Sequence, residues 1–217
     1  MLSQDADSTG DVLAEAAALT TTFLLIRHAA HVHLDRILSG RMHGVPLSDA
    51  GRSQAAALGR ALAGERIDRV ACSPLERTRE TAAAIAAAAC LPAPEPEEAL
   101  IEIDMGEWTG VAFDTLSGPA WDDWNAARGT ARIPGGETMA EAQARIVGYM
   151  QSVAAREAGA TVALVSHSDM IRGAVAHAIG LPLDHLLRFD VAPASVSRVL
   201  MGDWGSRLIS LNERMAA

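Results

Sequence analysis

Short apolar runs alternate with longer amphipathic stretches along this chain. The runs at residues 23–27, 67–73 and 160–168 are rich in Val, Leu, Ile and Ala, as expected of strands buried on both faces of a sheet. Polar residues follow each run directly. Two later segments, 195–203 and 206–212, predict a pair of strands that form a hairpin.

A helical pattern follows the first strand over residues 46–64. Leu58 and Leu62 are four residues apart and so lie on one face of the predicted helix. Ser48 is the expected N-cap, and Gly64 the expected end.

Capping signals predict the starts of two more helices. Ser73 is followed by a proline and, three residues on, by Glu76, which predicts a cap at Ser73. Thr138 and Glu141 have the same spacing and predict a capping box. With these two included, the helices predicted after the first one cover residues 73–90, 119–129, 135–159 and 169–182.

Strands that alternate with helices of this length predict an α/β fold, with a mostly parallel central sheet and helices on both faces. Residues 92–135 begin with a proline-rich acidic loop and continue through an extended piece at 100–110, and we expect a cap-like insertion over the active site. We expect residues 1–22 to form a mobile N-terminal arm and residues 23–217 to form a single domain.

Composition narrows the class of protein. Hydrophobic residues make up 49% of the 217 residues, enough for a full core, and the formal net charge of −9 disfavours nucleic acid as a partner. No apolar run approaches the roughly 18 residues of a membrane span, and residues 1–22 do not resemble a signal peptide. Cys72 and Cys90 have no metal-binding spacing, so we expect reduced thiols in a cytoplasmic protein.

Candidate chemistry follows three of the predicted strands. Arg27-His28, Ser73 to Arg77, and Ser166-His167-Ser168 each stand where a strand ends. Ligands of open α/β sheets bind outside the carboxyl ends of the strands, where helix N-termini also favour anions. The sequence therefore predicts a basic pocket for a phosphate group on an otherwise acidic protein.

Six motifs, in order along residues 23–173, together resemble the histidine phosphatase superfamily, the phosphoglycerate-mutase-like proteins. The motifs are LLIRHAA, PLSDAGRSQA, CSPLERTRETA, LIEIDMGEWTG, GGET and LVSHSDMIR. The resemblance implies a phosphoglycerate-mutase-like fold and a phosphatase that needs no metal or cofactor. Its implied partner is a small phosphorylated metabolite.

The resemblance also implies roles for individual residues. His28 is the implied nucleophile, which forms a phosphohistidine. Arg27, Arg77 and His167 are the implied ligands of the phosphoryl oxygens, and Glu102 the implied proton donor to the leaving group. Arg41 and Ser168 are implied as further phosphate-binding residues.

Other residues compete for two of these roles. Arg79 is the alternative to Arg77, while Asp104 and Glu107 are the alternatives to Glu102.

Some positions depart from the family pattern. Ala29 replaces the usual Gly after the signature His, and Thr109 replaces a Glu that often follows the Trp of the acidic loop. Leu34 stands where many members have a phosphate-binding Asn, so His31 or His33 is the candidate replacement, or the pocket binds phosphate less strongly.

Three other functions stay open at this point. A phosphoglycerate mutase would transfer the phosphoryl group within its substrate, and a binding module would hold a phosphorylated ligand without turnover. A metal-dependent hydrolase would use a cluster formed by His31, His33 and His43, although that spacing lacks the partners of a typical metal site.

Overall fold

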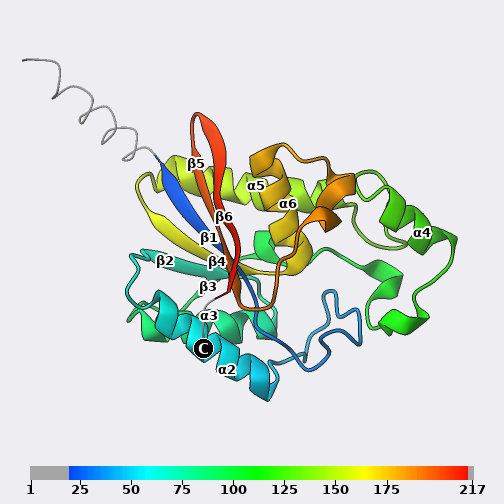
Figure 1. Cartoon of the computed structure of the whole chain (residues 1–217), viewed down its shortest axis with the longest axis horizontal. Helices are drawn as coiled ribbons and strands as arrows, with labels where there is room; N and C mark the ends of the chain where they lie inside the picture. Colours follow the sequence, from blue (N-terminus) through cyan, green and yellow to red (C-terminus); the bar gives the residue numbers. More distant parts are fainter. Residues whose placement is uncertain (1–19, 215–217) are drawn as a thin grey trace, which may run out of the picture.

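The structure, a computed structural model, describes residues 20–214 and contains a six-stranded sheet (Figure 1). The strands are β1 (Thr21–Arg27), β2 (Arg69–Cys72), β3 (Glu95–Pro96), β4 (Thr161–Ser166), β5 (Ser195–Gly202) and β6 (Gly205–Arg214). The helices are α2 (Asp49–Leu62), α3 (Glu76–Ala88), α4 (Pro119–Ala126), α5 (Met139–Arg156) and α6 (Ser168–Ile179). Short 3-10 turns are η1 (Glu98–Leu100), η2 (Gly106–Trp108), η3 (Phe113–Thr115) and η4 (Leu183–Arg188).

The strand order across the sheet is β3-β2-β4-β1-β5-β6. The pairs β1/β4, β2/β4 and β2/β3 are parallel, whereas β5 runs antiparallel to both β1 and β6. The mostly parallel sheet and the late hairpin are therefore confirmed.

Helices cover both faces of the sheet, because its central strands are apolar on both sides. In β1, Phe23 and Leu25 pack into the core cluster that includes α5 and α6. Leu24 and Ile26 point to the opposite face, into the cluster that includes α2 and α3. Figure 1 shows α5 and α6 on one side of the sheet and α2 and α3 on the other.

The predicted N-caps of two helices are confirmed. Ser48 caps α2 through a hydrogen bond from Gly51 N, and Thr138 and Glu141 form the predicted capping box of α5. Gly180 ends α6 in the left-handed conformation, with φ 66°, which costs glycine little.

Three local predictions differ from the structure in detail. α2 ends at Leu62 with Ala63 as its C-cap, so Gly64, the expected end, is the first residue after the cap. α3 begins at Glu76, with Leu75 in place of Ser73 at the N-cap, because the Ser73 hydroxyl is engaged in the site described below. Residues 100–110 form no strand: Ile101 has extended backbone, but the segment lies between the 3-10 turns η1 and η2, and η2 forms part of it.

The remaining sequence predictions concern domain limits and location. β1 begins at Thr21, so the predicted arm overlaps the sheet by two residues, and the rest of the arm lies outside the described residues. The division into an arm and a single domain with an insertion stays a prediction. No helix within residues 20–214 is both long enough and apolar enough to cross a membrane.

Candidate active site

A cavity of about 270 Å³ lies beyond the carboxyl ends of β1 and β4. Arg27 pairs with Ser166 across these parallel strands, so His28 and His167 leave the sheet side by side. Their ring centroids are 5.1 Å apart. The cavity brings together most of the predicted site residues: Arg27, His28, Arg77, Glu102 and Ser168 all line it.

The ring of His28 is held in one tautomer. Its Nδ1 lies 2.8 Å from the carbonyl oxygen of Ala29. A carbonyl oxygen only accepts, so Nδ1 carries the ring proton and Nε2 keeps a free lone pair. Burial, followed by the positive charges of Arg77 and Arg27, lowers the pKa of His28 well below its usual value. His28 is therefore a neutral imidazole with a nucleophilic Nε2.

His167 is oriented by Ser73 at the end of β2. The Ser73 hydroxyl lies 2.8 Å from His167 Nε2 and accepts a hydrogen bond from Leu75 N at 3.4 Å. The hydroxyl is thus free to donate to the imidazole, and when it does so the proton of His167 is on Nδ1. Nδ1 has no partner within residues 20–214. It is therefore a fixed donor without an acceptor, 3.9 Å from a carboxylate oxygen of Glu102.

His31 occupies the position next to His28, with ring centroids 5.2 Å apart. Its Nδ1 accepts a hydrogen bond from the backbone N–H of His33 at 3.2 Å, which places the ring proton on Nε2. Burial and the charges of Arg77 and Arg27 lower the pKa of His31 to about 4. His31 thus offers a neutral N–H donor, while Leu34 supplies only apolar surface to the same cavity.

The guanidinium groups of Arg27 and Arg77 are only partly used by the protein. Arg27 Nη1 donates to Val191 O at 2.7 Å, and Arg77 Nη2 donates to Gly40 O at 2.6 Å. Arg27 Nε and both Nε and Nη1 of Arg77 are buried without a partner in the part of the chain that the structure describes. Arg79, the alternative to Arg77, is exposed on α3. One buried and one half-buried guanidinium with unused donors form a site for an anion.

Glu102 is the carboxyl group closest to this chemistry. Burial, and then the negative charge of Asp169, raise the pKa of Glu102 to about 8. The group is therefore protonated at neutral pH, and its contact with neutral His167 is not an ion pair. The alternatives lie elsewhere: Glu107 is exposed, and Asp104 does not line the cavity. The arrangement provides a proton donor beside a nucleophile.

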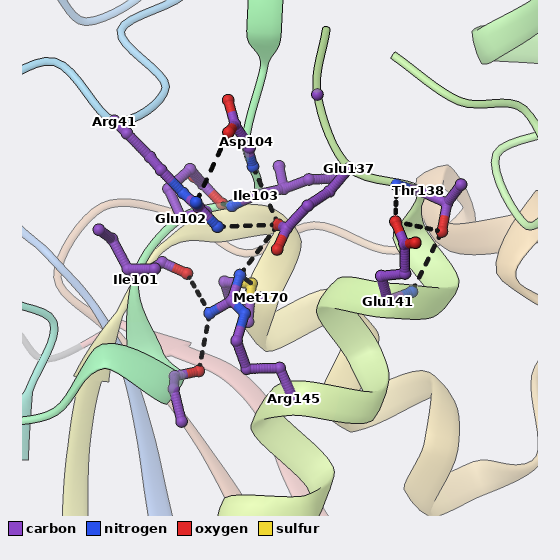
Figure 2. A network of polar contacts seen from close by, with 12 residues as sticks. Arg41, Ile101, Glu102, Ile103, Asp104, Glu137, Thr138, Glu141, Arg145 and Met170 are labelled. Atoms are coloured by element: carbon purple, nitrogen blue, oxygen red, sulfur yellow. Dashed lines mark hydrogen bonds and ion pairs between the residues drawn. The ribbon is translucent and has the colours of Figure 1, made fainter.

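A charged network holds the loop that carries Glu102 (Figure 2). Arg145 of α5 donates through Nη1 to the carbonyl oxygens of Ala99 and Ile101, at 2.9 and 2.8 Å. Its Nη2 lies 3.1 Å from Glu137 Oε2, which also accepts from the Asp104 backbone N–H at 3.0 Å. The residues on both sides of Glu102 are thus fixed to α5.

Arg41, predicted as a phosphate-binding residue, belongs to this network. Its Nε donates to the Glu102 carbonyl oxygen at 2.8 Å, and its Nη2 lies 2.9 Å from Glu137. Asp104 adds a third contact at 3.6 Å. Figure 2 shows the Arg41 guanidinium among Glu102, Asp104 and Glu137, and Arg41 does not line the cavity.

One wall of the cavity contains charged residues to which the sequence analysis assigned no role. Arg128, Asp169 and Arg172 line it together with Ser168. The Ser168 hydroxyl accepts a hydrogen bond from Arg172 Nη1 at 2.9 Å. Asp169 and Arg172 belong to the LVSHSDMIR motif, in which only His167 and Ser168 were assigned roles. Arg128 lies in the 92–135 segment, outside every motif.

Of the histidines considered for a metal cluster, His31 and His33 are neighbours, with ring centroids 6.4 Å apart. His43 does not join them: it is exposed and lies 3.9 Å from Glu76. Within residues 20–214, no group of three or more His, Cys, Asp or Glu side chains is arranged to hold a metal ion.

Comparisons with known proteins agree with this geometry. The profile of the Histidine phosphatase superfamily (branch 1) matches residues 23–214. Phosphoserine phosphatase 1 of Hydrogenobacter thermophilus is 31% identical over 195 residues, which cover 87% of this chain and 90% of that protein. A probable phosphoglycerate mutase of Yersinia pestis is 30% identical over 181 residues, which cover 81% of this chain and 82% of that protein.

A solved structure extends the likeness to the fold. YhfR of Bacillus stearothermophilus superimposes with a TM-score of 0.82 at 26% identity, covering 91% of this chain and 98% of that one. The family profile matches nearly the whole described chain, and two relatives are 30% and 31% identical to it: this chain belongs to the Histidine phosphatase superfamily (branch 1).

Proposed function

We propose that this protein hydrolyses small phosphate monoesters through a phosphohistidine formed on His28. The observation that carries the proposal is the hydrogen bond from His28 Nδ1 to the Ala29 carbonyl. It leaves Nε2 unprotonated beside two guanidinium groups with unused donors. The cavity of about 270 Å³ suits a small metabolite.

In the first step, the Nε2 lone pair of His28 attacks phosphorus and the bond from phosphorus to the ester oxygen breaks. The electron pair of that bond goes to the leaving oxygen, which takes the proton of Glu102. Arg27, Arg77, His31 and His167 donate to the equatorial oxygens of the phosphoryl group, where negative charge is spread in the transition state.

In the second step, water hydrolyses the phosphohistidine. The carboxylate of Glu102 takes a proton from the attacking water as its oxygen bonds to phosphorus, and the bond from phosphorus to nitrogen breaks. Phosphate leaves, and His28 and Glu102 return to their starting protonation states. The pKa of Glu102, raised to about 8, suits a group that alternates between acid and base near neutral pH.

The relatives support a phosphoryl-transfer reaction on a small substrate. One is named a phosphoserine phosphatase and another a probable phosphoglycerate mutase. The two reactions share the first step and differ in whether water or a substrate oxygen accepts the phosphoryl group. A mutase must keep water away from the phosphohistidine. The cavity wall carries groups of both charges, and Leu34 stands where many family members have a phosphate-binding Asn, so we favour hydrolysis.

The first experiment measures hydrolysis of p-nitrophenyl phosphate by the wild type and by His28→Ala, with and without EDTA. We expect turnover that resists EDTA and is lost in His28→Ala. His43→Ala, an exposed histidine of the following loop, is the matched control and is expected to keep wild-type turnover. Turnover that EDTA abolishes, or that survives in His28→Ala, contradicts the proposal.

A second assay separates the phosphatase from the mutase. Incubation with 3-phosphoglycerate should release inorganic phosphate without forming 2-phosphoglycerate. Formation of 2-phosphoglycerate as the main product would establish the mutase. Tight binding of phosphate esters without any turnover would favour the binding module.

A further inference from the structure

Arg128 is a second cationic group of the cavity, separate from Arg27 and Arg77. It follows α4 in the 92–135 segment, and it lines the cavity together with Ser168, Asp169 and Arg172. Only 8% of its surface is exposed. A buried guanidinium in a cavity wall requires an explanation, since burying a charge is costly unless it is paired.

The protein satisfies little of the hydrogen-bonding capacity of Arg128. A guanidinium has five N–H donors. Arg128 Nη2 donates to the side-chain oxygen of Asn125 at 2.8 Å, and Nε is buried without a partner among the described residues. Nη1 lies 3.9 Å from Asp169, too far for a hydrogen bond. The carbon at the centre of the guanidinium lies 5.1 Å from the centre of the Trp124 ring, which supports the group and fixes its plane.

Asp169 does not neutralise this wall. It also lies 3.6 Å from Arg172, so two guanidinium groups share one carboxylate. Arg172 has further partners: the Ser168 hydroxyl at 2.9 Å, the Phe189 carbonyl at 3.4 Å and exposed Asp190 at 3.9 Å. Arg128 has no such additional acceptor in the described chain beyond Asn125. The free positive charge of the wall is therefore at Arg128.

We propose that Arg128 binds a carboxylate of the substrate, so that the substrate class is small phosphate monoesters that also carry a carboxylate. This inference rests on the proposed function, since the phosphate of such a molecule must lie at Arg27 and Arg77. A carboxylate matches the planar guanidinium and brings one negative charge. A second phosphate would bring nearly two negative charges close to Asp169, which repels them.

Two substrate pairs isolate the carboxylate. 3-Phosphoglycerate and glycerol 3-phosphate differ in a carboxylate against a hydroxymethyl group. O-Phosphoserine and O-phosphoethanolamine differ only in the carboxylate. We expect the wild type to show a kcat/KM about 10- to 100-fold higher for the carboxylate member of each pair, as charge-assisted hydrogen bonds commonly provide.

Arg128→Gln is expected to bring this ratio close to one, and Arg128→Lys to keep part of it. The matched control is Arg132→Gln, because Arg132 is an exposed arginine of the same segment that pairs with Glu141 outside the cavity. Arg132→Gln should keep the wild-type ratio. An equal kcat/KM for both members in the wild type, or an unchanged ratio in Arg128→Gln, overturns the inference.

Two further measurements separate this inference from the proposed function. Hydrolysis of p-nitrophenyl phosphate that depends on His28 tests the reaction itself. Calorimetric binding of 3-phosphoglycerate and glycerol 3-phosphate to His28→Ala tests carboxylate recognition without turnover. Tighter binding of 3-phosphoglycerate that Arg128→Gln abolishes supports the inference even if no hydrolysis occurs, and equal binding of both esters contradicts it. Circular dichroism of each variant confirms that it is folded.

Discussion

The Ser73 hydroxyl lies 2.8 Å from Nε2 of His167, although 94 positions separate the two residues in the chain. With the hydroxyl as donor in this contact, the His167 proton is on Nδ1, 3.9 Å from a carboxylate oxygen of Glu102. Ser73→Ala removes the donor, so the ring is free to carry its proton on the wrong nitrogen. We expect kcat for p-nitrophenyl phosphate to fall about tenfold, the equivalent of one good hydrogen bond.

The control for Ser73→Ala is Ser197→Ala. Ser197 is equally buried and accepts a hydrogen bond from Asn212 N, in the β5/β6 hairpin. Its removal should lower stability by a similar amount and leave kcat unchanged. Equal effects of the two variants on kcat would show that Ser73 acts only through stability.

Glu102 should determine the alkaline limit of activity. Because burial and Asp169 raise its pKa to about 8, the carboxyl group loses the proton required by the leaving group as the pH rises above that value. We expect kcat for glycerol 3-phosphate to fall on the alkaline side of about pH 8. Glu102→Gln should abolish this pH dependence and lower kcat about 10²- to 10⁴-fold.

The effect should be smaller for p-nitrophenyl phosphate, whose leaving group needs less help from an acid. Glu107→Gln, a change at an exposed position of the same loop, should preserve the pH profile. An alkaline limit that persists in Glu102→Gln would assign the titration to another group.

The network in Figure 2 makes Glu137 a positioning residue for Glu102. Its Oε2 lies near Arg41, Arg145 and the Asp104 backbone N–H, at 2.9, 3.1 and 3.0 Å. Glu137→Gln leaves two partly buried guanidinium groups without their shared anion. Urea unfolding should show a loss of about 1–3 kcal/mol, and the alkaline limit of kcat should shift as the Glu102 loop loosens.

Glu98→Gln is the control for Glu137→Gln, since Glu98 is an exposed side chain at the start of the same loop. It should change neither the unfolding free energy nor the pH profile. A Glu137→Gln variant that is less stable but keeps its pH profile would limit the network to a structural role.

Gly51 allows α2 to approach the residues that follow His28. A Cβ atom at Gly51 would lie 1.8 Å from the carbonyl oxygen of Ala30, which accepts hydrogen bonds from both the backbone N and the hydroxyl of Ser48. Gly51→Ala should therefore displace this segment and lower the unfolding free energy by more than about 3 kcal/mol. Gly148→Ala is the opposite case, because a Cβ atom added at Gly148, in α5, would have no neighbouring residue within 4 Å outside its own helix backbone. It should raise stability by about 0.5–1 kcal/mol.

Stability should depend on pH through the buried histidines. Burial, assisted by nearby arginines, lowers the pKa of His28, His31 and His167, so the unfolded chain binds protons below about pH 6.5 that the native protein does not. These histidines therefore make their full contribution to the free energy of unfolding above pH 6.5, and that contribution is lost as the pH falls below it. The raised pKa of Glu102 works in the opposite direction, because the native carboxyl group keeps a proton that the unfolded chain releases.

Near pH 5.5 the unfolded chain should bind about two protons more than the native protein, which corresponds to roughly 3 kcal/mol per pH unit. Urea unfolding across pH 5–8 measures this slope. His28→Ala should reduce it by about one proton, while His43→Ala, at an exposed position, should leave it unchanged. A flat profile below pH 6.5 would show that the histidines are not held neutral.

Local residue patterns determined most of the fold. The apolar run of β1 packs on both faces, so its burial follows from its sequence alone. Ser48 and Thr138 cap helices because a cap needs only residues within one turn. His28 and Glu102 were also predictable, as short motifs carry the resemblance, and the structure places both in one cavity.

Only the tertiary structure decided which partner each polar side chain has. Ser73 has a local helix-capping signal, yet packing β2 beside β4 brings it to His167. Arg41 follows the family pattern for a substrate ligand, yet the fold pairs it with Glu137, and it does not line the cavity. Arg128 had no signal, because its cavity exists only once the 92–135 segment folds against α6. Ion pairs and hydrogen bonds depend on distances in space, and residues far apart in sequence come within reach only after strand order and packing are set.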